Sequence, residues 1–482
     1  MASTSTLRSL ANLISSSVDI IEERAQVPDL DLAYHECEVS NKGFSDPAVT
    51  DAISCIIAAT AQLVATIRPA HLTLISTAMM IHVPAALRTV TDLHVPEILR
   101  EAGPQGLHIR KIAALCRTSP GKLARILRLL ATEHIFKEVT PDVFAHNRIS
   151  SLLDTGKSVD KLIERQRSKW DGGVGIAAFV SHTGGNSLKF TSYLAETMQD
   201  PSFAYSEDHA KAPFNYTVRT DLPFWQWLDL RENEYERRKF GLAMTLLSVS
   251  RFCPRCSLLF FSGFEWGLLP KNSVVVDVGG GVGMATLPVA KVFPDLRIVI
   301  QDRPKFVEDA RKLWKDQLPD AVSSGQVAFQ VHDFFECQPI QAADVYLLRW
   351  IIHDWNDSLC ISILKRLREA AGPGTKLLIV DALMSYACQD SFASGIVGAV
   401  KPLPPKPLLA NFGHARVGEY LFDLQMLVTV NGQERTIRQF SDILEIAGWE
   451  IEEVKSAAAT QAHIIAIPAV VQPLPIALNT RL

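Results

Sequence analysis

A histidine stands at position 353 in the segment RWIIHDWND, directly after the apolar run YLLRW. Histidine is the side chain whose ordinary pKa lies nearest neutrality, so it is a common general base for a weakly acidic hydroxyl. The apolar run predicts a buried strand. Ligands of open α/β sheets bind at the carboxyl ends of the strands, and His353 is therefore the first candidate for chemistry.

A glycine-rich turn, VVVDVGGGVGM, occupies positions 274–284. The dinucleotide pattern GxGxxG, counted from Gly279 and Gly281, needs a third glycine at position 284, where methionine stands; the fourth glycine is Gly283. Asp277, two residues before the turn, would repel a pyrophosphate and attract a cofactor that carries an amino group and a sulfonium. The turn therefore predicts S-adenosyl-L-methionine as the cofactor.

Two further acids follow at the spacing that such a cofactor needs. Asp302 ends the apolar run RIVIQD, where an acid can bind the ribose hydroxyls. Asp333 follows the next predicted strand in VHDFF, where it can hold the adenine amino group while Phe334 lies against the ring. The three features in this order are a stronger indication than any one of them.

The elements that must position these residues alternate between strand and helix from residue 272 onward. The predicted strands are almost continuously apolar, which is typical of a parallel sheet that is covered on both faces. We therefore predict an α/β fold, Rossmann-like and doubly wound with a mostly parallel sheet. The proline-rich segment 384–418 interrupts the pattern and is expected to be a surface excursion.

The N-terminal half has a different character. Residues 48–90 predict long helices with breaks at Pro69 and Pro84, and their apolar stretches 52–67 and 70–90 are expected to be buried helices. Residues 95–150 show the helix, turn, helix and β-wing pattern of a winged helix. Between residues 94 and 150, nine Lys and Arg stand against five Asp and Glu, and leucines surround the second helix. This favours packing within protein over binding in a DNA groove.

Composition excludes several classes of protein. The chain has 482 residues, of which 48% are hydrophobic, and a net charge of −4, so it shows no strong bias toward nucleic acid or an anionic membrane. Its eight cysteines are scattered, which indicates a reducing compartment and a cytoplasmic location. Polar residues interrupt the apolar stretches, so no transmembrane span is expected, and no set of metal ligands stands out.

The motifs VVVDVGGGVG, Asp302, HDFF, RWIIHDWND and NGQERT resemble, in this order, the small-molecule O-methyltransferases of plants and fungi, of the caffeate, flavonoid and sterigmatocystin type. The resemblance covers roughly residues 95 to 467. It implies a class I methyltransferase domain, dependent on S-adenosyl-L-methionine, behind an N-terminal helical winged-helix domain that forms a homodimer. TDLPFWQWL and the proline-rich segment are most similar to members of fungal secondary metabolism.

The resemblance also implies roles for individual residues. Asp381 in LLIVDALM and Glu434 in NGQERT are the acids that accompany His353 in catalysis. The family has Glu at the first of these, so the shorter Asp381 reaches His353 either directly or through water. Arg349 stands where plant members have Lys near the adenine end of the cofactor.

Three residues are expected to bind the acceptor. Asp423 and Met426 in FDLQMLV match a family segment that lines the acceptor pocket, and a methionine suits a flat aromatic ring. Trp227 belongs to the aromatic stretch 214–228, which either lines an apolar pocket or fills a core.

The predicted function is methyl transfer to a phenolic hydroxyl of a small aromatic metabolite, with His353 as the general base. An N- or C-methyltransferase on the same scaffold is the nearest alternative, although an amine with a free lone pair needs a base less. A winged-helix DNA-binding regulator that senses S-adenosyl-L-methionine is a second. The expected partners are a small aromatic acceptor and a second copy of the chain, without nucleic acid or membrane.

The expected domain organisation has five parts. They are a loose N-terminal segment 1–44, a winged-helix dimerisation domain 45–160, connecting helices 161–250, a methyltransferase domain 251–468 that contains the 384–418 insertion, and a tail 469–482.

Overall fold

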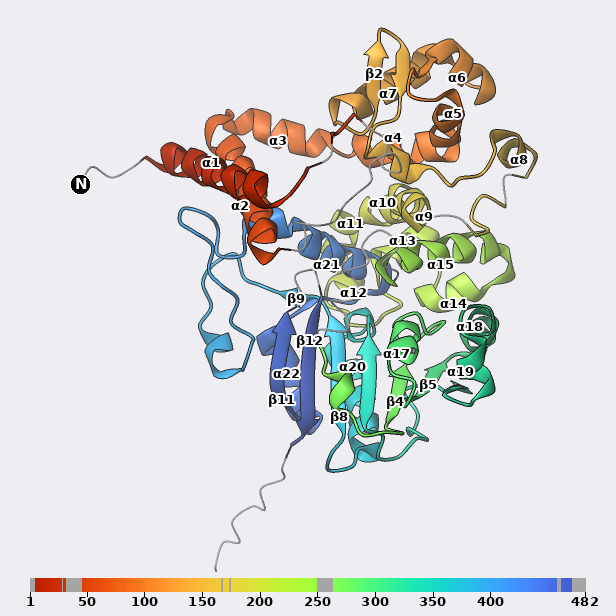
Figure 1. Ribbon diagram of the computed structural model, residues 1–482, viewed down its shortest axis with the longest axis vertical. Helices are drawn as coiled ribbons and strands as arrows, with labels where there is room; N and C mark the ends of the chain where they lie inside the picture. The colour runs from red at the N-terminus through yellow and green to blue at the C-terminus, as the bar shows by residue number, and fades with distance from the viewer. Residues whose placement is uncertain are drawn as a thin grey trace, which may run out of the picture. The chain divides into compact units, whose positions relative to one another are not determined.

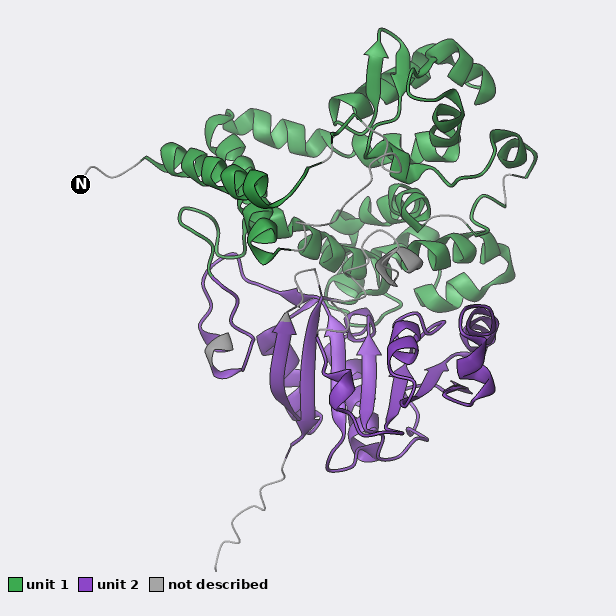
Figure 2. Ribbon diagram, in the orientation of Figure 1, with its two compact units in different colours: residues 1–255, 403–432 green, residues 256–402, 433–482 purple. Residues whose placement is uncertain are grey.

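The computed structural model describes residues 5–27, 29–31, 46–165, 168–172, 175–248, 263–456 and 461–469. The chain folds as two compact units, shown in Figure 2. Unit 1 comprises Met1–Arg255 and Leu403–Gly432, and unit 2 comprises Cys256–Pro402 and Gln433–Leu482. Most of the predicted tail lies outside the described residues.

A seven-stranded sheet forms the centre of unit 2, in the order β11-β12-β8-β7-β4-β5-β6 (Figure 1). The strands β6, β5, β4, β7 and β8 run parallel to one another. The strand β12 runs antiparallel to both β8 and β11. The predicted Rossmann-like, mostly parallel sheet is thus confirmed. The bounds are β4 Val274–Val278, β5 Arg297–Asp302, β6 Val327–Val331, β7 Val345–Arg349, β8 Lys376–Asp381, β11 Trp449–Ser456 and β12 Ala462–Pro468.

Helices cover both faces of this sheet because alternate residues of each strand point to opposite faces. Val276 belongs to a core cluster with α20 (Asp357–Ala370) and α22 (Ile437–Ile446). Val275 belongs to a second cluster, with residues of α17 (Leu287–Val292), α18 (Pro304–Gln317) and α19 (Pro319–Ser323). Burial on both faces explains why the strands are continuously apolar.

The sheet order places the candidate residues of unit 2 at one edge. The glycine turn, Asp302, Arg349 and Asp381 all lie at or just after the carboxyl ends of parallel strands. A short parallel pair of strands, β9 (Leu383–Met384) and β10 (Arg435–Thr436), brings the NGQERT segment to the end of β8.

Unit 1 begins with a helical hairpin, which differs from the loose segment that we expected. The helix α1 (Thr6–Arg24) packs on α2 (Pro47–Ile67), and Leu10 is fully buried beside Ala58 and Ala59. Apolar residues of α1 lie on one helical face, and burying that face stabilises the helix.

Three further helices follow: α3 (Ala70–Met79), α4 (His82–Asp92) and α5 (Val95–Ala102). Pro69 separates α2 from α3 as predicted. The second break precedes Pro84, which lies inside the first turn of α4, where a missing N–H costs nothing.

The predicted helix, turn, helix and wing correspond to α6 (Ile109–Leu115), α7 (Pro120–Thr132) and a small sheet in the order β1-β3-β2. The three strands are β1 Leu107–His108, β2 Lys137–Thr140 and β3 Val143–Ala145. Leu123, Leu127 and Leu130 of α7 are buried in the core of this region. The leucines thus pack within the protein.

The remaining helices of unit 1 include α21 (Val417–Val430), which we had assigned to the methyltransferase domain. Val428 and Val430 pack against the buried rings of Phe214 and Phe224, and this contact explains why residues 403–432 join unit 1. The expected insertion 384–418 is therefore divided between the units. The other helices are α8 Val159–Glu164, α9 Gly175–His182, the π-helical turn η3 Thr183–Ser187, α10 Leu188–Thr191, α11 Leu194–Gln199, α12 Pro201–Ala204, α13 Pro213–Val218, α14 Phe224–Asp229 and α15 Glu234–Ser248.

Two helical stretches, Pro47–Ile67 and Ala70–Asp92, are long and apolar enough to cross a membrane by length and composition. Core helices of soluble proteins meet the same criterion. The expectation that these helices would be buried is wrong for α3, which has no buried residue. Its apolar side chains are exposed on the surface of the single chain.

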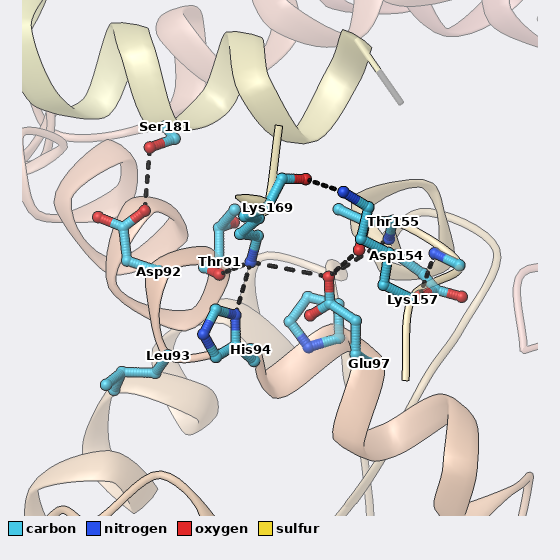
Figure 3. A network of polar contacts seen from close by, with 12 residues as sticks. Thr91, Asp92, Leu93, His94, Glu97, Asp154, Thr155, Lys157, Lys169 and Ser181 are labelled. Carbon is cyan, nitrogen blue, oxygen red and sulfur yellow. Dashed lines mark hydrogen bonds and ion pairs between the residues drawn. The ribbon is translucent and has the colours of Figure 1, made fainter. Parts of the chain in front are cut away.

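A buried ion pair ties two segments of unit 1 together (Figure 3). The Lys169 ammonium lies 3.6 Å from Glu97 Oε1 and donates to His94 Nδ1 at 3.1 Å and to the Thr91 carbonyl. Glu97 Oε1 also accepts from Thr155 Oγ1 at 2.6 Å. Burial lowers the pKa of Lys169, and the Glu97 carboxylate opposes that effect.

We expect Lys169→Met to lower the free energy of unfolding by about 3–5 kcal/mol, because the Glu97 carboxylate would stay buried without its cation. Lys161→Met, at an exposed position of α8, is the matched control and should change stability by no more than about 0.5 kcal/mol. Urea denaturation of both variants measures the difference. Equal stabilities would contradict a structural role for the ion pair.

Candidate active site

The glycine turn after β4 faces open space at Gly281 and packs tightly against neighbouring side chains at Gly283. Gly281 has φ +58°, a Cβ there would meet nothing within 4 Å, and its amide donates to Asp302 Oδ2 at 2.8 Å. At Gly283, with φ +76°, a Cβ would lie 2.3 Å from the Ile300 side chain. Glycine is thus required at 283 for packing, and 281 faces open space beside an acid at the end of β5.

Asp277 lies beneath this turn. We expected its carboxylate to face a cationic ligand, but the residue is 1% exposed and accepts from Thr286 Oγ1 at 2.9 Å. A Cβ on Gly280 would stand 2.5 Å from the Asp277 carboxyl carbon. Burial raises the pKa of Asp277 to about 6, although the Thr286 hydrogen bond and the Arg349 charge lower it. The acid therefore braces the turn from inside.

Aromatic rings line the end of β6 and the turn after β7. Phe334 lies against Gly279, where a Cβ would be 3.4 Å from the ring. Its ring centroid is 5.9 Å from that of Trp355, and Phe335 lies 5.0 Å from both rings. Asp333 is exposed, and its Oδ1 accepts from the Phe335 amide at 3.0 Å. The structure thus places the Phe334 ring beside Gly279 of the glycine turn, and Asp333 directly precedes it in the chain.

His353 and Glu434 form the central contact of the site. His353 lies in a short 3₁₀ turn, η6 (Ile352–Asp354), and its Nδ1 is 2.7 Å from Glu434 Oε1. The two residues are 9% and 4% exposed. A carboxylate at this position accepts a hydrogen bond from Nδ1–H and leaves Nε2 as the atom that can take up or release a proton. Asp354 Oδ1 lies 3.6 Å from Nε2.

The charges around His353 favour its protonated form. Burial lowers its pKa, but the carboxylates of Glu434 and Asp354, the Glu434 hydrogen bond and, more weakly, Asp381 raise it to about 10. The neutral imidazole is therefore a strong base. Its conjugate acid is matched in pKa to a phenol, whose ordinary pKa is about 10, so transfer of a phenolic proton costs little free energy.

Asp381 contributes charge to the site without a direct bond to His353. It is fully buried at the end of β8, and neither carboxylate oxygen has a hydrogen-bond partner among the described residues. Burial raises its pKa to about 7, while the His353 charge lowers it. The sequence left open whether Asp381 reaches His353 directly or through water. The structure shows no direct hydrogen bond between the two residues.

Arg349 ends β7, which lies between β4 and β8 in the sheet. Asp277 lies near the end of β4, and Asp381 ends β8. Burial lowers its pKa to about 10, opposed by Asp277 and Asp381 on the two sides. With its amide oxygen turned toward this strand end, Gln461 accepts from Arg349 Nη2 at 3.2 Å and from Trp350 Nε1 at 2.8 Å. Arg349 thus joins the glycine turn electrostatically to the acids around His353, a role that the motif alone did not indicate.

Two residues of the site escaped sequence reasoning. Trp350 has φ +55°, rare for a bulky residue, and its ring centroid lies 4.9 Å from that of His353. Arg435 is fully buried and donates to backbone carbonyls on both sides of His353. Two features of the sequence could have indicated them. Trp350 directly follows a predicted buried strand, and Arg435 directly follows Glu434 in NGQERT.

The expected acceptor-binding residues lie in unit 1. Trp227 and Met426 are half-buried and pack against the same aromatic cluster, which contains Phe214 and Phe224. The Trp227 ring centroid is 5.4 Å from that of Phe214. Asp423 is half-buried on α21, one helical turn before Met426. Within the described ranges, no group of three or more His, Cys, Asp or Glu could hold a metal ion.

Two protein families match separate parts of the chain. Residues 207–401 match the O-methyltransferase domain family, and residues 75–156 match the O-methyltransferase dimerisation domain family. The first region contains the glycine turn and His353, and the second contains the helices α4 to α7.

Known proteins are similar over nearly the whole chain. An O-methyltransferase of Armillaria gallica is 42% identical over 474 residues, which cover 96% of this chain and 99% of the relative. 4-O-methyltransferase 1 of Phanerochaete chrysosporium is 38% identical, with coverage of 93% and 95%. The structure of human N-acetylserotonin methyltransferase with S-adenosyl-L-methionine has a TM-score of 0.60 at 21% identity, covering 84% of this chain and 99% of that chain. This last similarity shows the fold.

We expect the pKa of His353 to lie well above the ordinary 6.5, because Glu434 and Asp354 raise it to about 10. Glu434→Gln removes the nearest negative charge, so the pKa should fall toward or below the ordinary 6.5, with burial as the dominant influence. Nitrogen-15 NMR titration of the imidazole, assigned by difference from His353→Ala, measures both values. A wild-type pKa at or below 6.5 would contradict the ion-pair interpretation.

Proposed function

Because this chain belongs to the O-methyltransferase family and depends on S-adenosyl-L-methionine, we propose that it methylates a phenolic hydroxyl of a small aromatic metabolite with His353 as the general base. The observation that carries this proposal is the buried contact between His353 Nδ1 and Glu434 Oε1 at the carboxyl edge of the sheet. A phenol must lose its proton to attack rapidly, and this pair is built to accept one.

The residues around the glycine turn fit the cofactor. Gly281 faces open space, the half-buried Asp302 already binds its amide, and Phe334 offers a ring beside Gly279. We propose that Asp302 holds the ribose hydroxyls, and that Asp333 and Phe334 hold the adenine. Gly281, with Gly279 beside it, lets the backbone approach the cofactor closely, while Gly283, Asp277 and Arg349 support the turn from within. The cofactor supplies an activated methyl on its sulfonium.

The protein's own part in the reaction is to hold and move a proton. The acting base is the neutral imidazole of His353, whose share rises with pH toward the pKa. The phenolic proton passes to its unprotonated Nε2, while Glu434 keeps Nδ1 protonated and stabilises the imidazolium that results. Asp354 adds negative charge near Nε2, and Asp381 adds it from within the core. An amine acceptor gains less from such a base, which favours an oxygen acceptor over the N-methyl alternative.

We propose that Trp227, Met426 and Asp423 bind the acceptor. The aromatic cluster of unit 1 suits a flat apolar ring, and a half-buried acid can accept a hydrogen bond from a polar substituent. One relative is named a 4-O-methyltransferase, which supports an oxygen acceptor. A DNA-binding regulator is not favoured, since the leucines of α7 are buried within the protein.

We further propose that the chain is a homodimer and that α3 contributes to the interface. Its exposed apolar residues, with their neighbours, form an apolar face that is 45–74% exposed and lies within or next to the matched dimerisation region. No Asp or Glu occurs between residues 52 and 91. A face of this kind indicates a protein interaction site. The apolar face consists of Ile67, Leu72, Leu74, Ile75, Met79, Met80 and Ile81.

Transfer of labelled methyl to a panel of phenols should occur with the wild-type protein and fall by at least about 100-fold in His353→Ala, because the general base is lost. His414→Ala, at an exposed position, is the control and should keep full activity. Calorimetry should show unchanged cofactor affinity in both variants. Full transfer by His353→Ala would exclude this residue as the base, and transfer to amines alone would replace the proposed acceptor.

The variant Leu74→Glu/Ile75→Glu should convert the dimer to a monomer, because two carboxylates from each copy would meet in an apolar interface. Leu268→Glu, at a position of unit 2 that is 80% exposed, should leave the oligomeric state unchanged. Light scattering after size-exclusion chromatography measures the mass. A monomeric wild type, or a dimeric double variant, would remove this face from the interface.

A further inference from the structure

We propose that Arg435 is a positioning residue that sets the geometry of the His353–Glu434 pair. This inference rests on the proposed role of His353 as the base. Arg435 directly follows Glu434 in the chain and is fully buried. Its backbone pairs with Leu383 in the short β10–β9 ladder, so the guanidinium extends from an anchored point of unit 2.

The guanidinium binds the His353 turn on both sides of the imidazole. Nη1 donates to the Ile352 carbonyl at 2.8 Å, and Nη2 donates to the Trp355 carbonyl at 2.7 Å. Ile352 immediately precedes His353 in the turn, and Trp355 ends it. A planar fork that holds two carbonyls fixes both the position and the tilt of the turn.

A carboxylate completes the arrangement. Asp357 Oδ1 accepts from Arg435 Nε at 3.0 Å and from Nη2 at 2.7 Å. It also accepts from Gln433 Nε2 at 3.0 Å, while the Gln433 amide donates to the His353 carbonyl at 3.0 Å. Residues 433 and 435 thus bind the turn and its following helix, and Glu434 between them faces the imidazole.

The His353 turn is short, and the guanidinium adds to the backbone hydrogen bonds that hold it. It is a single 3₁₀ turn that follows Trp350, a residue with φ +55° in a region that bulky side chains rarely adopt. The Ile352 carbonyl also accepts from the Trp355 amide at 3.4 Å, and the weak donor Cys360 Sγ lies 3.2 and 3.4 Å from the Ile352 and Trp355 carbonyls. Without the guanidinium, the imidazole could shift relative to Glu434, and a displacement of about 1 Å costs up to about 100-fold in rate.

The test compares Arg435→Ala and Arg435→Lys with Arg368→Ala. Arg368 Nε donates to the Gly448 carbonyl of unit 2 at 2.8 Å. Arg368→Ala is therefore the control for losing an arginine that binds the backbone outside the site. We expect both Arg435 variants to bind the cofactor with unchanged affinity, and kcat to fall by about 10-fold or more with little change in the KM for the phenol. Lysine should not restore kcat, because it lacks the planar fork. Arg368→Ala should keep its kcat.

Two readouts separate positioning from stability. The NMR pKa of His353 should fall in both Arg435 variants and stay unchanged in Arg368→Ala, because Glu434 no longer holds Nδ1 at hydrogen-bond distance. Added guanidinium at low concentration should raise the kcat of Arg435→Ala but not that of His353→Ala. If Arg435→Ala fails to fold, Arg435→Lys carries the same comparison of kcat and pKa.

An unchanged kcat and an unchanged His353 pKa in a folded Arg435 variant would overturn the proposal. The pKa readout needs no acceptor, so it stands apart from the proposed function. Full activity of His353→Ala would instead refute the base assignment, while a lowered His353 pKa in the Arg435 variants would still establish the positioning role.

Discussion

His353 and Glu434 meet at 2.7 Å inside unit 2, although they are 81 positions apart in the chain. An imidazolium and a carboxylate lose much of their hydration on burial, and only a close, well-oriented contact compensates for that loss. The contact therefore constrains its surroundings: the turn after β7 and the segment after α21 must both be held rigidly at the end of β8. The β9–β10 ladder and the Arg435 guanidinium provide this rigidity.

The cofactor side of the site obeys a related constraint. The glycine turn keeps an open face only because acids stabilise it from other directions, Asp277 from below through Thr286 and Asp302 from the next strand. Arg349, on the strand between β4 and β8, balances the charge of Asp277 and of Asp381. One buried cation thus links the turn to the acids around His353, and the site is a single electrostatic system.

Unit 1 is organised by packing instead of charge. The helix α21 belongs to unit 1, although the segments before and after residues 403–432 belong to unit 2. Val428 and Val430 of α21 complete the apolar core around the aromatic cluster of unit 1. The buried Lys169–Glu97 pair is the exception, and it orders a segment that has few apolar residues of its own. The apolar face around α3 is exposed in the described part of the chain, which fits the match to a dimerisation domain.

The periodicity of the apolar residues and the spacing of glycines and acids sufficed to predict the sheet, the cofactor and the placement of His353, since each depends on residues within one strand and its following turn. Tertiary structure alone decided that Asp277 lies beneath the turn, that Asp381 makes no direct bond to His353, that the Trp350 ring lies tilted against the imidazole, and that α21 joins unit 1. These outcomes depend on strand order and side-chain packing between distant segments, which no local pattern encodes.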